Sequence, residues 1–146
     1  MVSGEVEGRR RVPWALLGVI SAGGILGSLA RYGISEAFGH GPAEFAWATF
    51  LINVSGCLLI GVLMAAITEV WEAHPLTRPF LGIGVLGGYT TFSAYVVDAQ
   101  RALDVGQART ALLYLAVTPV CALAAVFAGT RATRLAARPL KRRPRS

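Results

Sequence analysis

The sequence has little charge within its apolar runs, and this scarcity excludes several classes of function. Only 15% of its 146 residues are charged and 54% are hydrophobic, a composition typical of a small membrane domain. We expect every acidic residue at the end of an apolar run, in a connecting segment or before the first run. A proton-coupled antiporter needs an acid buried in the membrane, so this distribution argues against that class.

Catalytic and metal-binding groups are also scarce. The two histidines, His40 and His74, fall in connecting segments, so no serine has an obvious base at membrane depth. Cys57 and Cys121 lie in apolar runs with no second thiol or histidine nearby, which indicates small buried side chains rather than a disulfide or a metal site. We therefore expect a protein that is not an enzyme.

The basic residues lie mostly at the two ends of the chain. The formal net charge is +6, but lysine and arginine form no stripe interleaved with aromatic residues. We therefore expect membrane lipid, and no nucleic acid, as the partner of these ends. The chain divides into a basic N-terminal segment at 1–12, a membrane domain at 13–130 and a basic C-terminal tail at 131–146.

Four apolar runs predict an all-α membrane protein with four transmembrane helices. We expect spans at 13–35, 45–68, 79–100 and 109–130, each close to the ~20 residues that a bilayer requires. The first run is longer than the core of a signal peptide, so we expect it to remain as a span. Short connections join the spans. Because the number of spans is even, both termini lie on the same side of the membrane.

A glycine-rich segment, Gly82-Ile-Gly-Val-Leu-Gly-Gly-Tyr-Thr-Thr-Phe-Ser-Ala-Tyr95, predicts a broken third helix. Each glycine costs about 1 kcal/mol relative to alanine inside a helix, and Gly87-Gly88 is the point where we expect the break. A break frees backbone carbonyls, which at membrane depth must meet an ion, a partner chain or water. The alternative is that the glycines allow a close helix crossing.

Several polar positions in the other spans allow two interpretations. Asn53 is the one side-chain amide of the second run, and it suits either an anion or a hydrogen bond to a neighbouring helix. Arg31 ends a small-residue face of the first run, and it either reaches to the membrane interface or lines an anion vestibule. Pro119 removes a backbone donor from the fourth run, which leaves a carbonyl one turn earlier free for another partner.

The polar groups expected at membrane depth are donors without negative charge. Hydroxyls follow the glycine pair at Thr90, Thr91 and Ser93, while Phe92 and Tyr95 project their rings from one helical face. The edge of an aromatic ring is electrostatically positive, so it can interact with an anion as a polar donor does. Such groups favour a small anion over a cation, because closely spaced donors can replace the water around a hydrated anion.

Three motifs, in this order, resemble the CrcB/Fluc family of fluoride ion channels. They are Gly24-x-x-Gly27-Ser-x-x-Arg31-Tyr32, Asn53-x-x-Gly56 and Gly87-Gly88-Tyr-Thr-Thr-Phe-Ser93. The resemblance covers residues 15–130. It implies passive fluoride export that gives fluoride resistance, an antiparallel dimer of four-helix subunits with two narrow pathways, and a structural sodium ion at the dimer interface. The competing hypotheses are a proton-coupled antiporter and a non-conducting subunit whose glycines serve only packing.

The resemblance also implies roles for individual residues. The fluoride pathway would be lined by one amide, three aromatic rings and three aliphatic hydroxyls: Asn53, Phe92, Tyr95, Tyr114, Thr91, Ser93 and Thr118. The backbone carbonyls of Gly87 and Thr90 would hold sodium, since neutral oxygens suit it better than a divalent metal. Tyr95 stands where the family usually has a second phenylalanine, and Thr118 where serine is commoner. The hydroxyl of Tyr95 would donate to fluoride or narrow the path.

The distribution of basic residues predicts the orientation in the inner membrane. The side with both termini carries Arg9, Arg10, Arg11, Arg78, Arg131, Arg134, Arg138, Lys141, Arg142, Arg143 and Arg145. The opposite side has only Arg101 and Arg109 near its loops, with Arg31 at a helix end. Because basic residues near span ends stay in the cytoplasm, we expect cytoplasmic termini. An antiparallel dimer would then pair this chain with an oppositely oriented paralogue, rather than form a dual-topology homodimer.

Overall fold

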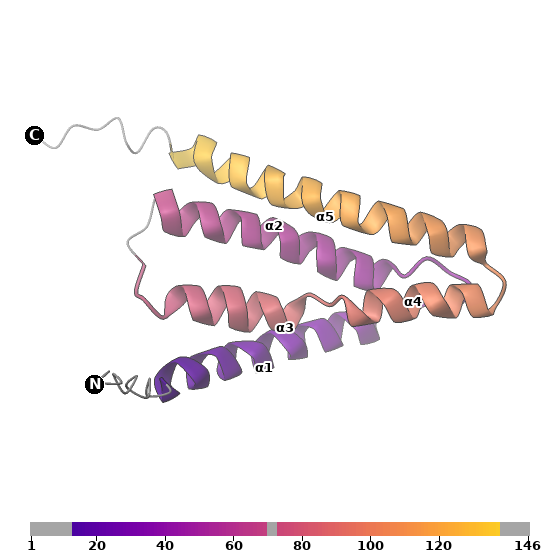
Figure 1. Cartoon of the computed structure of the whole chain (residues 1–146), viewed down its shortest axis with the longest axis horizontal. Coiled ribbons are helices and arrows are strands. Elements are labelled where there is room, and N and C mark those ends of the chain that lie inside the picture. The colour runs from indigo at the N-terminus through magenta and orange to yellow at the C-terminus, as the bar shows by residue number, and fades with distance from the viewer. Residues whose placement is uncertain (1–12, 70–72, 138–146) are drawn as a thin grey trace, which may run out of the picture.

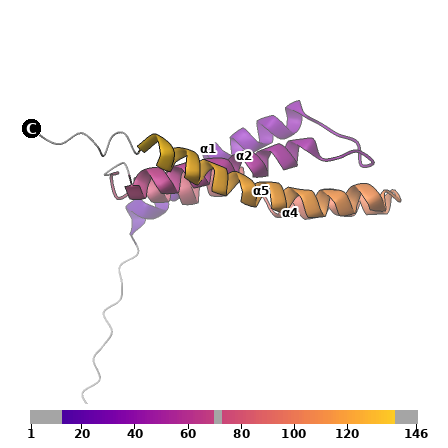
Figure 2. The same cartoon turned by 90° about the horizontal axis from the view of Figure 1, so that it is seen from above.

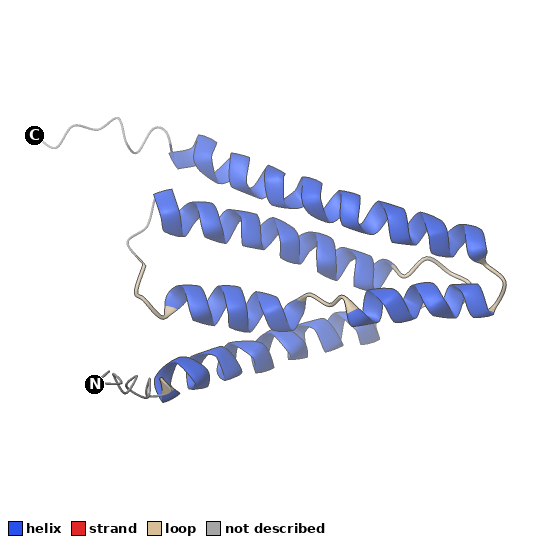
Figure 3. Ribbon diagram, viewed as in Figure 1, coloured by secondary structure: helices blue, strands red, loops and turns tan. Residues whose placement is uncertain are grey.

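The computed structural model describes residues 13–69 and 73–137; the basic segment 1–12 and residues 138–146 of the predicted tail lie outside them. Its elements are, in order, α1 (Trp14–Ala37), α2 (Trp47–Glu69), η1 (Arg78–Leu86), α3 (Gly87–Tyr89), α4 (Ser93–Asp104) and α5 (Ala108–Ala137). Within the described residues, four helical segments are long and apolar enough to cross a membrane, the third being η1, α3 and α4 together. The prediction of four transmembrane helices is confirmed (Figure 3).

The helices pack as two pairs joined at the third span. α2 packs along α5, α1 packs along η1 and α3, and α4 contacts α5. The start of α1 and the end of α5 lie at the same end of the bundle in both views (Figure 1, Figure 2). The turn between α4 and α5 lies at the opposite end (Figure 1). This arrangement agrees with termini on one side of the membrane.

Close contact between α1 and the third span depends on glycine. A Cβ atom added to Gly88 would lie 2.5 Å from the carbonyl oxygen of Gly24, and one added to Gly27 would overlap the carbonyl of Val85. Backbone cannot move aside as a flexible side chain does, so these positions exclude any larger residue. The glycines therefore serve the close crossing that the sequence offered as an alternative.

The third helix is broken, but the break falls after the glycine pair. Gly87 keeps helical angles (φ −66°, ψ −35°), whereas Thr90 is extended (φ −74°, ψ 156°). The helix resumes at Ser93. The predicted position at Gly87-Gly88 is therefore slightly too early: Gly88 packs closely against the Gly24 backbone of α1 and stays in the helix.

The spans also end later than hydropathy suggested. α4 reaches Asp104 and α5 reaches Ala137, beyond the predicted ends near residues 100 and 130. Part of the predicted basic tail is therefore a continuation of the last helix. Arg134 lies in this extension, and its Nε atom donates to Glu69 Oε1 of α2 at 2.6 Å. The ion pair joins the ends of the two helices.

Candidate functional site

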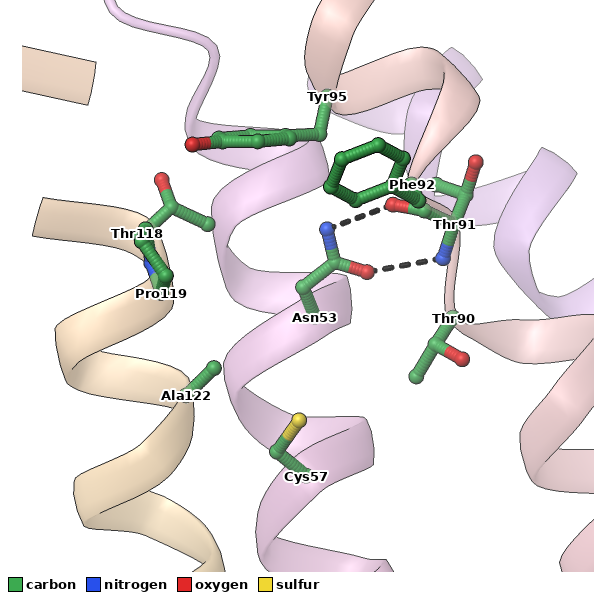
Figure 4. Close-up of a pocket in the computed structure, with 9 residues that line it drawn as sticks. All are labelled: Asn53, Cys57, Thr90, Thr91, Phe92, Tyr95, Thr118, Pro119 and Ala122. Carbon is green, nitrogen blue, oxygen red and sulfur yellow. Dashed lines mark hydrogen bonds between the residues drawn. The ribbon is translucent and has the colours of Figure 1, made fainter. Parts of the chain in front are cut away.

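Asn53 holds the break of the third span open. Its Nδ2 donates to the Thr91 carbonyl at 2.8 Å, and its Oδ1 accepts the Thr91 amide at 2.9 Å (Figure 4). Asn53 thus bonds to both the amide and the carbonyl of Thr91, which in a continuous helix would bond to the backbone of the same helix. The interpretation of Asn53 as a link between helices is confirmed. An amide nitrogen carries two hydrogens, so the second remains available to a further acceptor.

Arg31 binds the backbone beside the break. Its Nε donates to the Gly88 carbonyl at 3.1 Å, and the Ser28 hydroxyl approaches the same oxygen at 3.4 Å. The Nε group of Arg31 therefore binds the third span, and the interpretation that the side chain reaches the membrane interface stays a prediction. This contact gives Arg31 a structural role at the junction of α1 and α3, while a role in an anion vestibule stays a prediction.

Several carbonyls at the break have lost their helical donors, among them those of Gly87 and Thr90. The Thr91 amide, which would bond to Gly87 in a continuous helix, goes to Asn53. The Ala94 amide, which would bond to Thr90, goes to the Thr91 hydroxyl at 3.1 Å. Within the described residues neither the Gly87 nor the Thr90 carbonyl accepts another hydrogen bond. These are the two oxygens that the family resemblance assigns to sodium.

The oxygen atoms available as ligands at the break suit sodium rather than a divalent metal. The free oxygens are neutral carbonyls, and the described chain contains no group of three or more His, Cys, Asp or Glu side chains that could hold a metal. Divalent cations in proteins usually require carboxylate, imidazole or thiolate ligands. The residues present therefore fit a sodium ion, provided that further oxygens come from elsewhere.

An uncharged groove of about 270 Å³ lies beside the break (Figure 4). It is lined by α2, the break, α4 and α5, through Asn53, Cys57, Thr90, Thr91, Phe92, Tyr95, Thr118, Pro119 and Ala122. Five of the seven predicted pathway residues belong to this lining, whereas Ser93 and Tyr114 do not. A pathway with polar groups and no fixed charge can bind an ion without trapping it.

Aromatic rings continue from the groove into the bundle. The Phe92 ring is 77% exposed and lies 5.6 Å from the Tyr95 ring, which lies 5.2 Å from Tyr114. Tyr114 in turn meets Phe45 edge to face at 5.1 Å. The exposed face of Phe92 has room for a ligand or a partner chain. Ser93 lies outside this row, and its hydroxyl is 3.3 Å from that of Thr91.

Two buried hydroxyls on α5 have no partner. The Tyr114 and Thr118 side chains are 2% and 4% exposed, and neither hydroxyl finds a hydrogen-bond partner among the described residues. Burying such a group unpaired costs about 1–3 kcal/mol. Four residues separate them, so they lie one turn apart on one helical face. Thr118 also lines the groove, so its hydroxyl is free to donate to a species that enters there.

The hydroxyl of Tyr95 donates to the protein backbone and not into the groove, while the prediction that it narrows the path stays untested. It donates to the backbone carbonyl of Leu115 at 2.6 Å. Pro119 stands four residues after Leu115 within α5 and lacks the N–H that would normally bond to this carbonyl. The prediction that Pro119 leaves a carbonyl one turn earlier for another partner is confirmed.

Asp98 corrects one expectation from the sequence. It was placed at a span end, but α4 runs on to Asp104, and the Asp98 side chain is only 7% exposed. Its carboxylate accepts the Thr49 hydroxyl at 2.6 Å and lies 3.8 Å from His40 Nε2 and 3.7 Å from Arg101. The sequence reasoning missed this cluster beside the buried end of the site.

Helical spacing is the signal that could have found Asp98. It follows Tyr95 by three residues, and Thr49 precedes Asn53 by four. Both spacings place two side chains on the same helical face. The cluster therefore lies on the faces of α4 and α2 that also carry the predicted pathway residues.

Four membrane-spanning helices, a discontinuous third span and an uncharged groove beside it define a small multi-pass membrane protein. The family model described as "CrcB-like protein, Camphor Resistance (CrcB)" matches residues 18–130. The chain belongs to the CrcB family.

Relatives with similar sequences carry a more specific name. A protein of Nocardia farcinica named "Fluoride-specific ion channel FluC 2" is 51% identical over 122 residues, covering 84% of this chain and 87% of the relative. One of the same name from Thermobifida fusca is 51% identical over 120 residues, covering 82% and 89%. Another from Streptomyces avermitilis is 50% identical over 114 residues, covering 75% and 72%. The match in each case extends over most of both chains.

Proposed function

We propose that this chain is a subunit of a fluoride-selective channel that lets fluoride leave the cytoplasm passively and so gives fluoride resistance. The names of its relatives support this function. The observation that carries it in this chain is the buried, unpartnered hydroxyl of Thr118, a residue that lines the groove. A hydrogen-bond donor that is buried away from water without an acceptor destabilises the fold. An anion that enters the groove can accept this hydrogen bond and offset the cost.

The geometry suggests how fluoride passes. The second hydrogen of Asn53 and the hydroxyl of Thr118 come from opposite walls of the groove. The Phe92 and Tyr95 rings contribute positive edges at its mouth. Together these groups replace the water shell of a hard anion step by step, and no cationic side chain lines the groove to hold it. The same neutrality keeps the ion mobile.

The antiporter alternative requires an acid that meets the transported species. Asp98 is buried, but it does not line the groove, and Thr49, His40 and Arg101 already surround its carboxylate. Fluoride efflux from sealed proteoliposomes that contain this chain together with its proposed oppositely oriented partner separates the hypotheses. Efflux that is fast when a potassium ionophore balances charge, and that needs no proton gradient, supports the channel. Efflux that requires a proton gradient supports the antiporter, and no efflux supports a packing subunit.

We also propose that a sodium ion binds the Gly87 and Thr90 carbonyls on the axis of a dimer. One chain offers the Gly87 and Thr90 oxygens, so the same two oxygens of a second copy would complete a four-oxygen site. Sodium would then hold the two breaks together without taking part in conduction. The expected result is that sodium raises the unfolding temperature of the purified dimer at matched ionic strength, while potassium does not. Equal stabilisation by both ions would contradict the proposal.

We propose an antiparallel dimer in the inner membrane, with the termini of this chain in the cytoplasm. The open groove and the exposed Phe92 ring both leave room for a second subunit. The basic residues favour one orientation, so the partner would be an oppositely oriented paralogue. A topology reporter fused to the C-terminus should give a cytoplasmic signal. Equal signals from both sides, or fluoride flux from this chain purified alone, would favour a dual-topology homodimer instead.

A further inference from the structure

The hydroxyl of Tyr95 is committed to the backbone of α5. Its side chain lines the groove, although the residue is only 8% exposed. The oxygen lies at the rim of the ring that is turned toward α5 (Figure 4), where it donates to the Leu115 carbonyl at 2.6 Å. A phenol has a single hydrogen to donate. While this bond exists, the hydroxyl cannot also donate to an anion in the groove.

Pro119 creates the need for this bond. In an ordinary helix the amide of residue 119 would donate to the Leu115 carbonyl, but proline has no N–H. α5 nevertheless continues as a helix to Ala137. The carbonyl faces the bundle and must be satisfied by a side chain from another helix, because a buried acceptor without a donor destabilises the fold. Tyr95 is that side chain.

Building on the proposed channel function, we propose that Tyr95 is a positioning residue whose hydroxyl ties α4 to α5 at the carbonyl freed by Pro119. The tie fixes the Tyr95 ring between the Phe92 ring at 5.6 Å and the Tyr114 ring at 5.2 Å. The ring, and not the hydroxyl, then faces the fluoride pathway. Tyrosine at this position works with Pro119 as a pair, and neither residue performs its role without the other.

A double-mutant cycle tests this pairing. Tyr95→Phe should lower the ratio of folded to unfolded protein in denaturant about tenfold, as expected for one lost hydrogen bond to a buried acceptor. It should also lower fluoride efflux, because the ring is no longer held in place. Pro119→Ala restores an N–H to the Leu115 carbonyl and favours the helix. In that background, Tyr95→Phe should change both quantities less than about twofold, because the carbonyl no longer needs the phenol.

The other outcomes overturn the proposal. Equal losses of efflux in both backgrounds would mean that the hydroxyl serves fluoride directly. Unchanged efflux in both backgrounds would mean that the tie does not position the pathway. Tyr32→Phe is the matched control, since this phenol is 64% exposed, and it should change neither quantity. If the unmutated chain, reconstituted with its proposed partner subunit, carries no fluoride, the channel function fails, whereas folding measurements across the same four proteins still test the tie.

Discussion

Replacing Asn53 with alanine removes the side chain that holds the third span open. Two hydrogen bonds of 2.8 and 2.9 Å to the Thr91 backbone are lost. Each is worth about 1 kcal/mol, so we expect a loss of about 2 kcal/mol, and somewhat more if the Thr91 groups stay unpaired. The Thr91 amide then becomes free to bond to the Gly87 carbonyl. That bond would extend the helix into the break and occupy an oxygen that we propose for sodium.

Asn53→Asp tests whether the two hydrogen bonds to the Thr91 backbone, rather than the volume of the side chain, explain the effect of Asn53→Ala. The carboxylate can still accept the Thr91 amide, but its second oxygen would face the Thr91 carbonyl where Asn53 now donates. Two acceptors at this distance repel unless the acid is protonated. A negative charge beside the groove would also oppose fluoride. We therefore expect Asn53→Asp to lose as much stability as Asn53→Ala and to lose fluoride flux at least as severely.

The measurements are reversible unfolding in detergent, fluoride efflux and the sodium dependence of both. Ser55→Ala is the matched control, because the Ser55 hydroxyl also links α2 to the third span, through one bond of 2.9 Å to the Tyr89 hydroxyl. Losing it should cost about 1 kcal/mol, with flux retained. If Asn53→Ala costs no more than Ser55→Ala and keeps both flux and its response to sodium, Asn53 is only a packing residue.

Three further perturbations test other parts of the account. Phe92→Ile keeps apolar bulk but removes the ring edge, so fluoride flux should fall severely while size-exclusion chromatography still shows the dimer. Retained flux would mean that Phe92 serves only in packing. Thr118→Val removes a buried, unpartnered hydroxyl from the lining of the groove, so stability should rise by about 1 kcal/mol while flux falls. Unchanged flux would remove Thr118 from the pathway. Gly88→Ala places a methyl group against the Gly24 backbone, so the yield of folded protein should fall sharply. A yield equal to that of the unmutated protein would contradict the close contact between α1 and the third span.

Hydropathy was sufficient to predict the four spans, because membrane length requires long apolar helices. The position of the break could not be predicted to the residue. Glycine pairs weaken a helix locally, but Gly88 is held in the helix by α1. The break falls instead where Asn53 reaches the backbone from another helix. That contact joins residues 38 positions apart, and no local pattern reports it.

The candidate site was predictable in its residue types more than in its contacts. Motif resemblance selected five residues that line one groove, and Pro119 correctly signalled a free carbonyl. The partner of that carbonyl, Tyr95, depends on how α4 packs on α5. Asp98 was misplaced because α4 extends beyond the predicted end of the span. Tertiary packing decided the partner of this carbonyl, which composition and spacing could not, whereas helical spacing could have found Asp98.

The reversal potential of the purified dimer in a planar bilayer tests the central claim most directly. With fluoride at a tenfold gradient and chloride equal on both sides, a passive fluoride-selective pathway should reverse its current near the fluoride equilibrium potential, about 59 mV from zero. The value should not move when a pH gradient is added. A current that reverses near zero, or one that follows the proton gradient, would contradict fluoride-selective conduction by this protein.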